Sequence, residues 1–83
     1  MRKLTDETLF ARCVAAHLVY HRLSQGLSKL AVAEKAGLDQ RTITFIERGT
    51  NIPSIVTLFL VCRAIGVDIS KIVAASAKGK VPE

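Results

Sequence analysis

The segment "AGLDQRTITFIERG", residues 36–49, decides the fold because it contains the connection between two helices. Gly37 can adopt the positive φ that commonly ends one helix, and Asp39 is a good N-cap for the next one. Only residues 37–39 therefore separate the two predicted helices. A connection this short forces the helices to cross steeply, as they do in a helix-turn-helix.

The two helices beside this connection have clear predicted boundaries. The first begins after Ser28, another good N-cap, and ends at Gly37. The second begins after Asp39 and ends at Gly49, and residues 50–53 follow as a turn.

The steep crossing determines which side chains stay outside. Ala33 is the small residue expected at the contact between the helices. Ile43 and Ile46 are expected to face back toward the core, where their partners are Val32 and Leu38. The side chains left pointing away from the domain are Gln40, Arg41, Thr44 and Phe45. Long polar side chains in the first turn of so short a helix indicate that something outside the domain recognises them.

The remainder of the chain is also predicted to be helical, because strand-like alternation of apolar and polar residues is absent and Gly and Pro fall between the predicted helices. Three further helices are expected, at about residues 5–24, 55–65 and 69–75. Ser54 and Asp68 are the expected N-caps of the last two. The sequence thus predicts an all-α fold, a compact five-helix bundle. The domain is expected to span residues 1–76, followed by a flexible C-terminal tail at residues 77–83.

Length and composition limit the class of protein. A chain of 83 residues suggests one domain, and a hydrophobic content of 49% argues against a disordered chain. The formal net charge of +5 favours a polyanionic partner such as nucleic acid or a membrane surface. The most apolar stretch, residues 55–67, is interrupted by Arg63 and is shorter than the roughly 20 residues that span a bilayer. No membrane segment is therefore expected.

The N-terminal segment and the cysteines predict a cytoplasmic protein. Asp6, Glu7 and Arg12 interrupt any apolar run that could serve as a secretory signal. Cys13 and Cys62 are too few for a disulfide framework, so both are expected to be free thiols.

Two segments resemble the Cro and phage-repressor family of DNA-binding domains, also called the XRE family: "GLSKLAVAEKAGLDQRTITFIERG" (residues 26–49) and "PSIVTLFLVCRAIGV" (residues 53–67). The resemblance covers about residues 18–73 and includes Arg22. Each motif alone is weak, but together, in order and at the family's spacing, they are specific. The resemblance implies a lambda-repressor-like domain that inserts its third helix, residues 40–49, into the major groove of DNA.

Carried over residue by residue, the resemblance implies two sets of DNA contacts. The base-reading set is Gln40, Arg41, Thr44 and Phe45, and the phosphate-contacting set is Lys29, Arg48, Thr50 and Asn51. Gln can pair with adenine, Arg with guanine, and Phe can touch the methyl group of thymine. The family usually has Gln where Lys29 stands. A lysine can hold a phosphate, but it cannot accept a hydrogen bond from Gln40.

The resemblance also implies an ion pair between Arg22 and Glu47, which would tie the first helix to the end of the third. In the fourth helix, the expected core stripe is Ile55, Leu58, Val61, Cys62 and Ile65. A second stripe, with residues of the fifth helix, is expected to form a homodimer interface: Val56, Phe59, Leu60, Arg63, Ile69, Ile72 and Val73. The alternative is that the second stripe is covered within one chain by Leu9, Phe10 and Cys13.

Other kinds of chemistry have weaker support. Cys13, His17 and His21 lie four residues apart, and such a spacing places side chains on one helix face. A metal site is conceivable, but the favoured interpretation is a buried Cys13, a partly buried His21 and a solvent-facing His17, with no metal or other cofactor. Redox sensing by Cys13 or Cys62 is a further alternative. Catalysis is not expected, because no nucleophile elbow and no phosphate-cradling glycine loop occur.

These observations together predict a sequence-specific regulator of transcription that binds double-stranded DNA as a homodimer. The expected location is cytoplasmic and nucleoid-associated. The small size is similar to that of phage repressors, restriction–modification controller proteins and antitoxin-type regulators. The alternative is a protein-interaction module that keeps the fold without specific DNA binding. The modest positive charge of residues 28–49 and their apolar surface positions favour this alternative.

Overall fold

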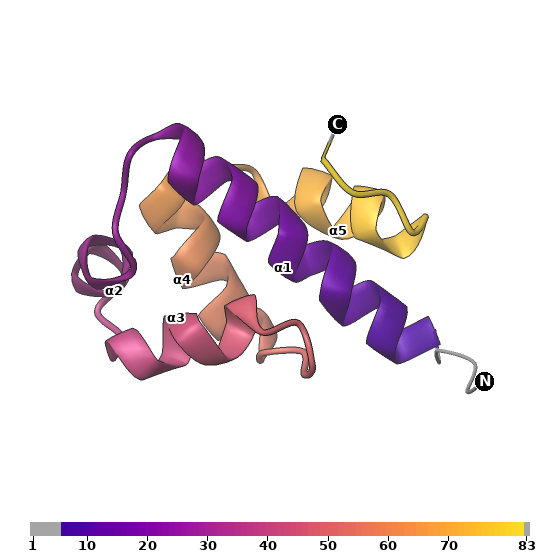
Figure 1. Ribbon diagram of the computed structural model, residues 1–83, viewed down its shortest axis with the longest axis horizontal. Helices are drawn as coiled ribbons and strands as arrows, with labels where there is room; N and C mark the ends of the chain where they lie inside the picture. The colour runs from indigo at the N-terminus through magenta and orange to yellow at the C-terminus, as the bar shows by residue number, and fades with distance from the viewer. Residues whose placement is uncertain (1–5, 83) are drawn as a thin grey trace.

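The computed structural model describes residues 6–82 and contains five α-helices (Figure 1). They are α1 (Asp6–Ser24), α2 (Lys29–Ala36), α3 (Gln40–Glu47), α4 (Ile55–Ile65) and α5 (Ile69–Ala77). No β-strand occurs within residues 6–82. The expected all-α, five-helix fold is thus confirmed, while the expected start of the first helix at Thr5 lies outside the described residues.

Local side-chain chemistry sets most of the helix boundaries. Four helices follow a residue whose side-chain oxygen accepts a hydrogen bond from a backbone N–H of the first turn: Ser28, Asp39, Ser54 and Asp68. Two helices end at a glycine with positive φ, which is 72° at Gly37 and 83° at Gly66. These caps satisfy backbone groups that a helix end leaves unpaired. The boundaries predicted for α2 and α4 are confirmed.

The core forms where α2 packs against α3 and α4, and where α1 packs against α3 and α4. Val32 of α2, Ile43 of α3 and Ile65 of α4 are each at most 1% exposed. Ala33 is also buried, as the steep crossing of α2 and α3 requires, and so is Ile46. With its isoleucines in the core, α3 must direct its other side chains outward.

The end of α3 differs from the prediction. The helix stops at Glu47 rather than at Gly49, which follows with a φ of 71°. A Cβ atom at Gly49 would lie 3.3 Å from the Cα of Arg12 and 3.3 Å from the Cβ of Ala15. Glycine at this position therefore permits both the turn after α3 and the close approach of that turn to α1.

One residue expected in the core of α4 is exposed. Ile55 is 67% exposed, so its predicted burial is wrong. The other residues of the expected core stripe are buried: Leu58, Val61, Cys62 and Ile65. Ile55 is the first residue of α4, and a helical side chain leans back toward the N-terminus of its helix. It therefore extends beyond the layer in which its four stripe partners are buried.

The fifth helix is longer than expected and continues to Ala77. It packs against α1. Ser76, which was expected to lie beyond the helix, is 2% exposed. The chain then runs along α1, where the Nε2 of His17 lies 2.9 Å from the carbonyl oxygen of Lys80. The flexible tail expected at residues 77–83 stays a prediction. In the structure, α5 and the residues after it lie beside α1 (Figure 1).

Candidate nucleic-acid interface

The outward surface of α3 consists of polar and aromatic side chains. Gln40 and Arg41 in the first turn are exposed, Thr44 is partly buried, and Phe45 is 45% exposed. The two buried isoleucines fix the opposite side of the helix in the core. The side chains expected to point away from the domain therefore share this surface, and their role in reading bases stays a prediction.

An ion pair that the sequence analysis missed lies at the first turn of α3. Oδ1 of Asp39 accepts the backbone N–H of Arg41 at 2.8 Å, and Oδ2 accepts Nη2 of the same residue at 3.2 Å. The side-chain hydrogen bond from Arg41 lowers the pKa of Asp39, and the same bond raises the pKa of Arg41. Residues two apart do not share a helix face, so helical periodicity gives no signal for this pair. The N-cap geometry of Asp39 brings the two side chains together.

Two hollows adjoin the ion pair on the surface of α3. One of about 340 Å³ is lined by Asp39, Arg41, Thr42 and Phe45. The other, of about 300 Å³, is lined by Arg41, Thr44, Phe45 and Arg48. Because Arg41 and Phe45 line both hollows, they form a ridge between them.

The residues expected to contact phosphate lie in the chain before and after α3. Lys29 is the first residue of α2, where backbone N–H groups are oriented to bind an anion. Arg48, Thr50 and Asn51 follow α3 and are exposed. Nδ2 of Asn51 donates a 3.4 Å hydrogen bond to Oγ1 of Thr50. In the chain, cationic and hydrogen-bonding groups are thus available both before and after the outward surface of α3.

The predicted ion pair between Arg22 and Glu47 is present. Nε and Nη2 of Arg22 donate to the two carboxylate oxygens of Glu47, and Nη1 donates to the carbonyl oxygen of Leu27 at 2.9 Å. The guanidinium thus links α1 to the end of α3 and to the loop before α2. Since the charge of Glu47 is neutralised within the fold, it does not subtract from the positive charge of the surface beside α3.

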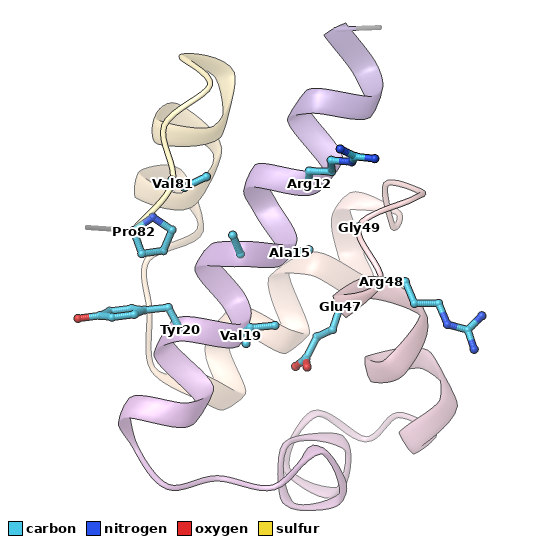
Figure 2. A pocket seen from close by; sticks show the side chains of 10 residues that line it. Arg12, Ala15, Val19, Tyr20, Glu47, Arg48, Gly49, Val81 and Pro82 are labelled. Carbon is cyan, nitrogen blue, oxygen red and sulfur yellow. The ribbon is translucent and has the colours of Figure 1, made fainter. Parts of the chain in front are cut away.

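A groove of about 620 Å³ crosses the outer surface of α1 (Figure 2). The residues that α1 contributes are Arg12, Ala15, Ala16, Val19 and Tyr20. Val81 and Pro82 lie along one side of α1, and Gly49 lies along the other. The lining also includes Glu47, whose carboxylate is already paired with Arg22, and Arg48, whose side chain extends away from the groove. The lining is therefore mostly apolar.

The side chains considered for a metal site are buried or have other contacts. Cys13 is 1% exposed, and His21 makes an edge-on ring contact with Tyr20 at a centroid distance of 5.2 Å. His17, which was expected to face solvent, is partly buried, and its Nε2 bonds to the carbonyl oxygen of Lys80. Among residues 6–82, no group of three or more His, Cys, Asp or Glu side chains is placed to hold a metal ion.

Both cysteines are free and buried, as expected. Burial raises the pKa of the Cys62 thiol to about 11, and the negative charge of Asp68 adds to the effect. The thiol is therefore protonated at neutral pH. Because the thiolate is the reactive form of cysteine, this environment disfavours redox sensing by Cys62.

An apolar surface extends from the start of α4 along one side of the helix. We define the α4 apolar surface by four exposed side chains: Ile52 (46%), Ile55 (67%), Val56 (63%) and Phe59 (46%). Ile55, Val56 and Phe59 share one side of α4, and Ile52 lies in the loop before the helix. The Cζ of Arg63 lies 5.5 Å from the centroid of the Phe59 ring, over its face. Ile52 and Ile55 were not expected on this surface.

The predicted dimer interface needs correction at one residue, while three others are only partly available. Ile72 is 3% exposed and belongs to the core, so it is not free to contact another chain. The partly buried residues, which pack against the same core, are Leu60, Ile69 and Val73. The intramolecular alternative is not supported for Val56 and Phe59, which stay exposed although α1 packs against α4.

Comparison with protein-family models gives one match, to the helix-turn-helix family HTH_3, over residues 19–72. This region includes α2, α3 and α4 entirely, with the Arg22–Glu47 ion pair and the outward surface of α3. The comparisons with curated proteins and with solved structures gave no match. Within residues 6–82, none of the helices combines the length and the apolar character needed to cross a membrane.

Proposed function

Because the chain belongs to the Cro and phage-repressor (XRE) family of helix-turn-helix proteins, we propose that it is a sequence-specific regulator of transcription. In this proposal α3 enters the major groove of double-stranded DNA, and two copies of the chain bind the two half-sites of one operator. The protein acts by binding rather than by catalysis, in the cytoplasm and on nucleoid DNA. Its role is of the phage-repressor, controller or antitoxin type.

The surface of α3 is the observation that carries this proposal. Gln40 and Arg41 are exposed in its first turn, and Phe45 follows on the ridge between the two hollows. Gln can hydrogen-bond to adenine with two bonds, Arg can do so with guanine, and an aromatic ring can contact the thymine methyl group. The first turn of a recognition helix is the part that reaches base edges, which accounts for long polar side chains there.

Charge beside α3 supports phosphate binding. Residues 28–49 carry four basic and three acidic side chains. Glu47 is paired internally with Arg22, and its side chain is only 8% exposed. The net charge of the side chains that remain at the surface is therefore more positive than the count suggests. Lys29 and Arg48 would each neutralise a phosphate, so affinity should depend strongly on salt.

We place the homodimer contact on the α4 apolar surface. Three of its four side chains share one side of α4, and the fourth, Ile52, follows Thr50 and Asn51, which are proposed to contact phosphate. Burying such side chains would contribute about 1.5–3 kcal/mol each. A dimer is also what a helix-turn-helix needs to hold two recognition helices about 34 Å apart, the spacing of successive major grooves.

The test is binding to DNA duplexes at two salt concentrations. A duplex selected from a random pool and a scrambled duplex are each titrated, with fluorescence anisotropy as the readout. The proposal expects tighter binding to the selected duplex. The logarithm of the association constant should fall linearly with the logarithm of the salt concentration, with a slope of about −0.9 per phosphate contact. Equal affinity for both duplexes would contradict sequence-specific recognition.

A protein-interaction module is the second candidate, and the exposed apolar side chains favour it. Leu30 on α2 and Leu23 at the end of α1 are 51% and 61% exposed, apart from the α4 apolar surface. Binding through apolar surface depends weakly on salt, whereas phosphate binding weakens steeply. The salt series therefore separates the two candidates.

A further inference from the structure

The carboxylate of Asp39 holds Arg41 at three points. Oδ1 accepts the backbone N–H of Arg41 at 2.8 Å and its Nε at 3.3 Å, while Oδ2 accepts Nη2 at 3.2 Å. The two side-chain bonds use the edge of the guanidinium that carries Nε and Nη2. Because Asp39 is also the N-cap of α3, its carboxylate is itself fixed by the start of the helix.

This arrangement leaves the other edge of the guanidinium available. A guanidinium has five N–H donors in a planar fork, and the bonds to Asp39 occupy one edge of it. The remaining edge carries Nη1 and the second hydrogen of Nη2. Two parallel N–H donors of this kind match the O6 and N7 acceptors of guanine in the major groove. The Arg41 side chain is 92% exposed, so a base edge can approach it.

We propose that Asp39 is a positioning residue, which orients the free edge of the Arg41 guanidinium to recognise one guanine in each DNA half-site. The inference rests on the function proposed above and adds the base that Arg41 recognises and the residue that sets its orientation. An arginine held in this way loses less rotamer freedom on binding than a free one. The negative charge of Asp39 also repels phosphate, so the residue favours selectivity over general affinity for DNA.

The contrast with Arg48 supports this division of roles. Arg48 is exposed one turn beyond the ridge, and no carboxylate among residues 6–82 is paired with it. An arginine free to move can follow a phosphate, which needs charge but little fixed geometry. Arg41 differs from Arg48 because its side chain, 92% exposed, also donates two hydrogen bonds to one carboxylate.

The experiment compares base preferences of variants by selection from randomised DNA duplexes. Asp39→Ser removes the carboxylate but keeps a good N-cap, and Asp39→Asn keeps the cap and one acceptor oxygen. Asp68→Ser is the matched control, because Asp68 caps α5 in the same way, with Oδ1 accepting the N–H of Ser70 at 2.9 Å. It changes the net charge equally and lies away from α3. Circular dichroism verifies that each variant is folded.

We expect Asp39→Ser to reduce the preference for guanine at one position of each half-site by roughly tenfold. Asp39→Asn should reduce it less, Asp68→Ser should leave it unchanged, and Arg41→Ala should abolish it. Adding Asp39→Ser to Arg41→Ala should have no further effect on the preference at that position.

Three outcomes would overturn the inference. Unchanged preference in both Asp39 variants, with loss in Arg41→Ala, would show that Arg41 needs no positioning residue, and the proposed function would stand. Equal weakening of binding to all DNA sequences in the Asp39 variants would show that Asp39 acts only as a helix cap. Absence of any selected sequence for the unsubstituted protein would overturn the proposed function as well.

Discussion

Arg22 on α1 and Glu47 at the end of α3 form two parallel hydrogen bonds, 2.7 Å from Nε to Oε2 and 2.9 Å from Nη2 to Oε1. The side chains are only 10% and 8% exposed, so water does little to screen the pair. Because the two side chains meet at two points, the pair restrains the relative orientation of α1 and α3 as well as the distance between them. The pair therefore helps to set the orientation in which α3 presents its outward surface.

Glu47→Gln should lower the free energy of unfolding by about 3–5 kcal/mol, because it leaves the charge of Arg22 buried without a counter-charge. Glu34→Gln is the control, since Glu34 is exposed on α2 and should change stability by less than about 0.5 kcal/mol. Urea denaturation measures both variants. A Glu47→Gln variant as stable as the unsubstituted protein would show that the pair is not structural.

Lys29→Ala should weaken binding to all DNA sequences alike and reduce the salt slope by about 1, because it removes one phosphate contact. Lys35→Ala removes the same charge from the exposed C-terminal end of α2 and should leave the slope nearly unchanged. Titrations at several salt concentrations give both slopes. Equal slopes for the two variants would indicate that Lys29 acts only through net charge.

Phe59→Asp should give a folded monomer with poor operator binding, because it places a charge in the α4 apolar surface. Leu23→Asp introduces the same charge at another exposed apolar residue and should leave the dimer intact. Sedimentation velocity reports the oligomeric state, and circular dichroism reports folding. A Phe59→Asp dimer would place the interface elsewhere, and an unfolded variant would favour a role for Phe59 within one chain.

The raised pKa of Cys62 predicts a loss of stability at alkaline pH. The folded thiol titrates at about 11 and the ordinary value is 9.0, so between these values the unfolded chain loses its proton first. The stabilising contribution is therefore complete below pH 9.0 and is lost as the pH rises toward 11.

Urea denaturation of the unsubstituted protein and of Cys62→Ala, at about pH 8 and about pH 10.5, isolates this contribution. Other groups titrate in both proteins and cancel in the comparison. The unsubstituted protein should lose more stability between the two pH values than the variant does. An equal loss in both would assign the alkaline effect to other residues.

Ser76→Ala should raise the free energy of unfolding by about 1 kcal/mol. The Oγ of Ser76 is buried and has no hydrogen-bond partner among residues 6–82, so removing it relieves an uncompensated desolvation. Ser24→Ala is the control, because the Oγ of Ser24 is exposed and bonds to the carbonyl of Tyr20. A clear loss of stability in Ser76→Ala would show that the hydroxyl has a partner in solution.

The sequence by itself determined the features that depend on a few neighbouring residues. Ser28, Asp39 and Gly37 set the boundaries of α2 and α3 because capping acts within one helical turn. The spacing of Ile43 and Ile46 decided which side of α3 is buried, and hence which side chains are outside. These are the features from which the outward surface of α3 could be predicted.

Only the tertiary structure decided which of several similar apolar or polar side chains are covered. Ile55 and Ile72 are both apolar and helical, yet one is 67% and the other 3% exposed. Ser76 is polar and buried, because α5 lies on a part of α1 far away in the sequence. The bond between the side chains of Asp39 and Arg41 depends on rotamers that periodicity does not specify. Periodicity indicates which side chains share a helix face. Burial requires another segment to cover that face, and the packing of the whole chain decides which segment does so.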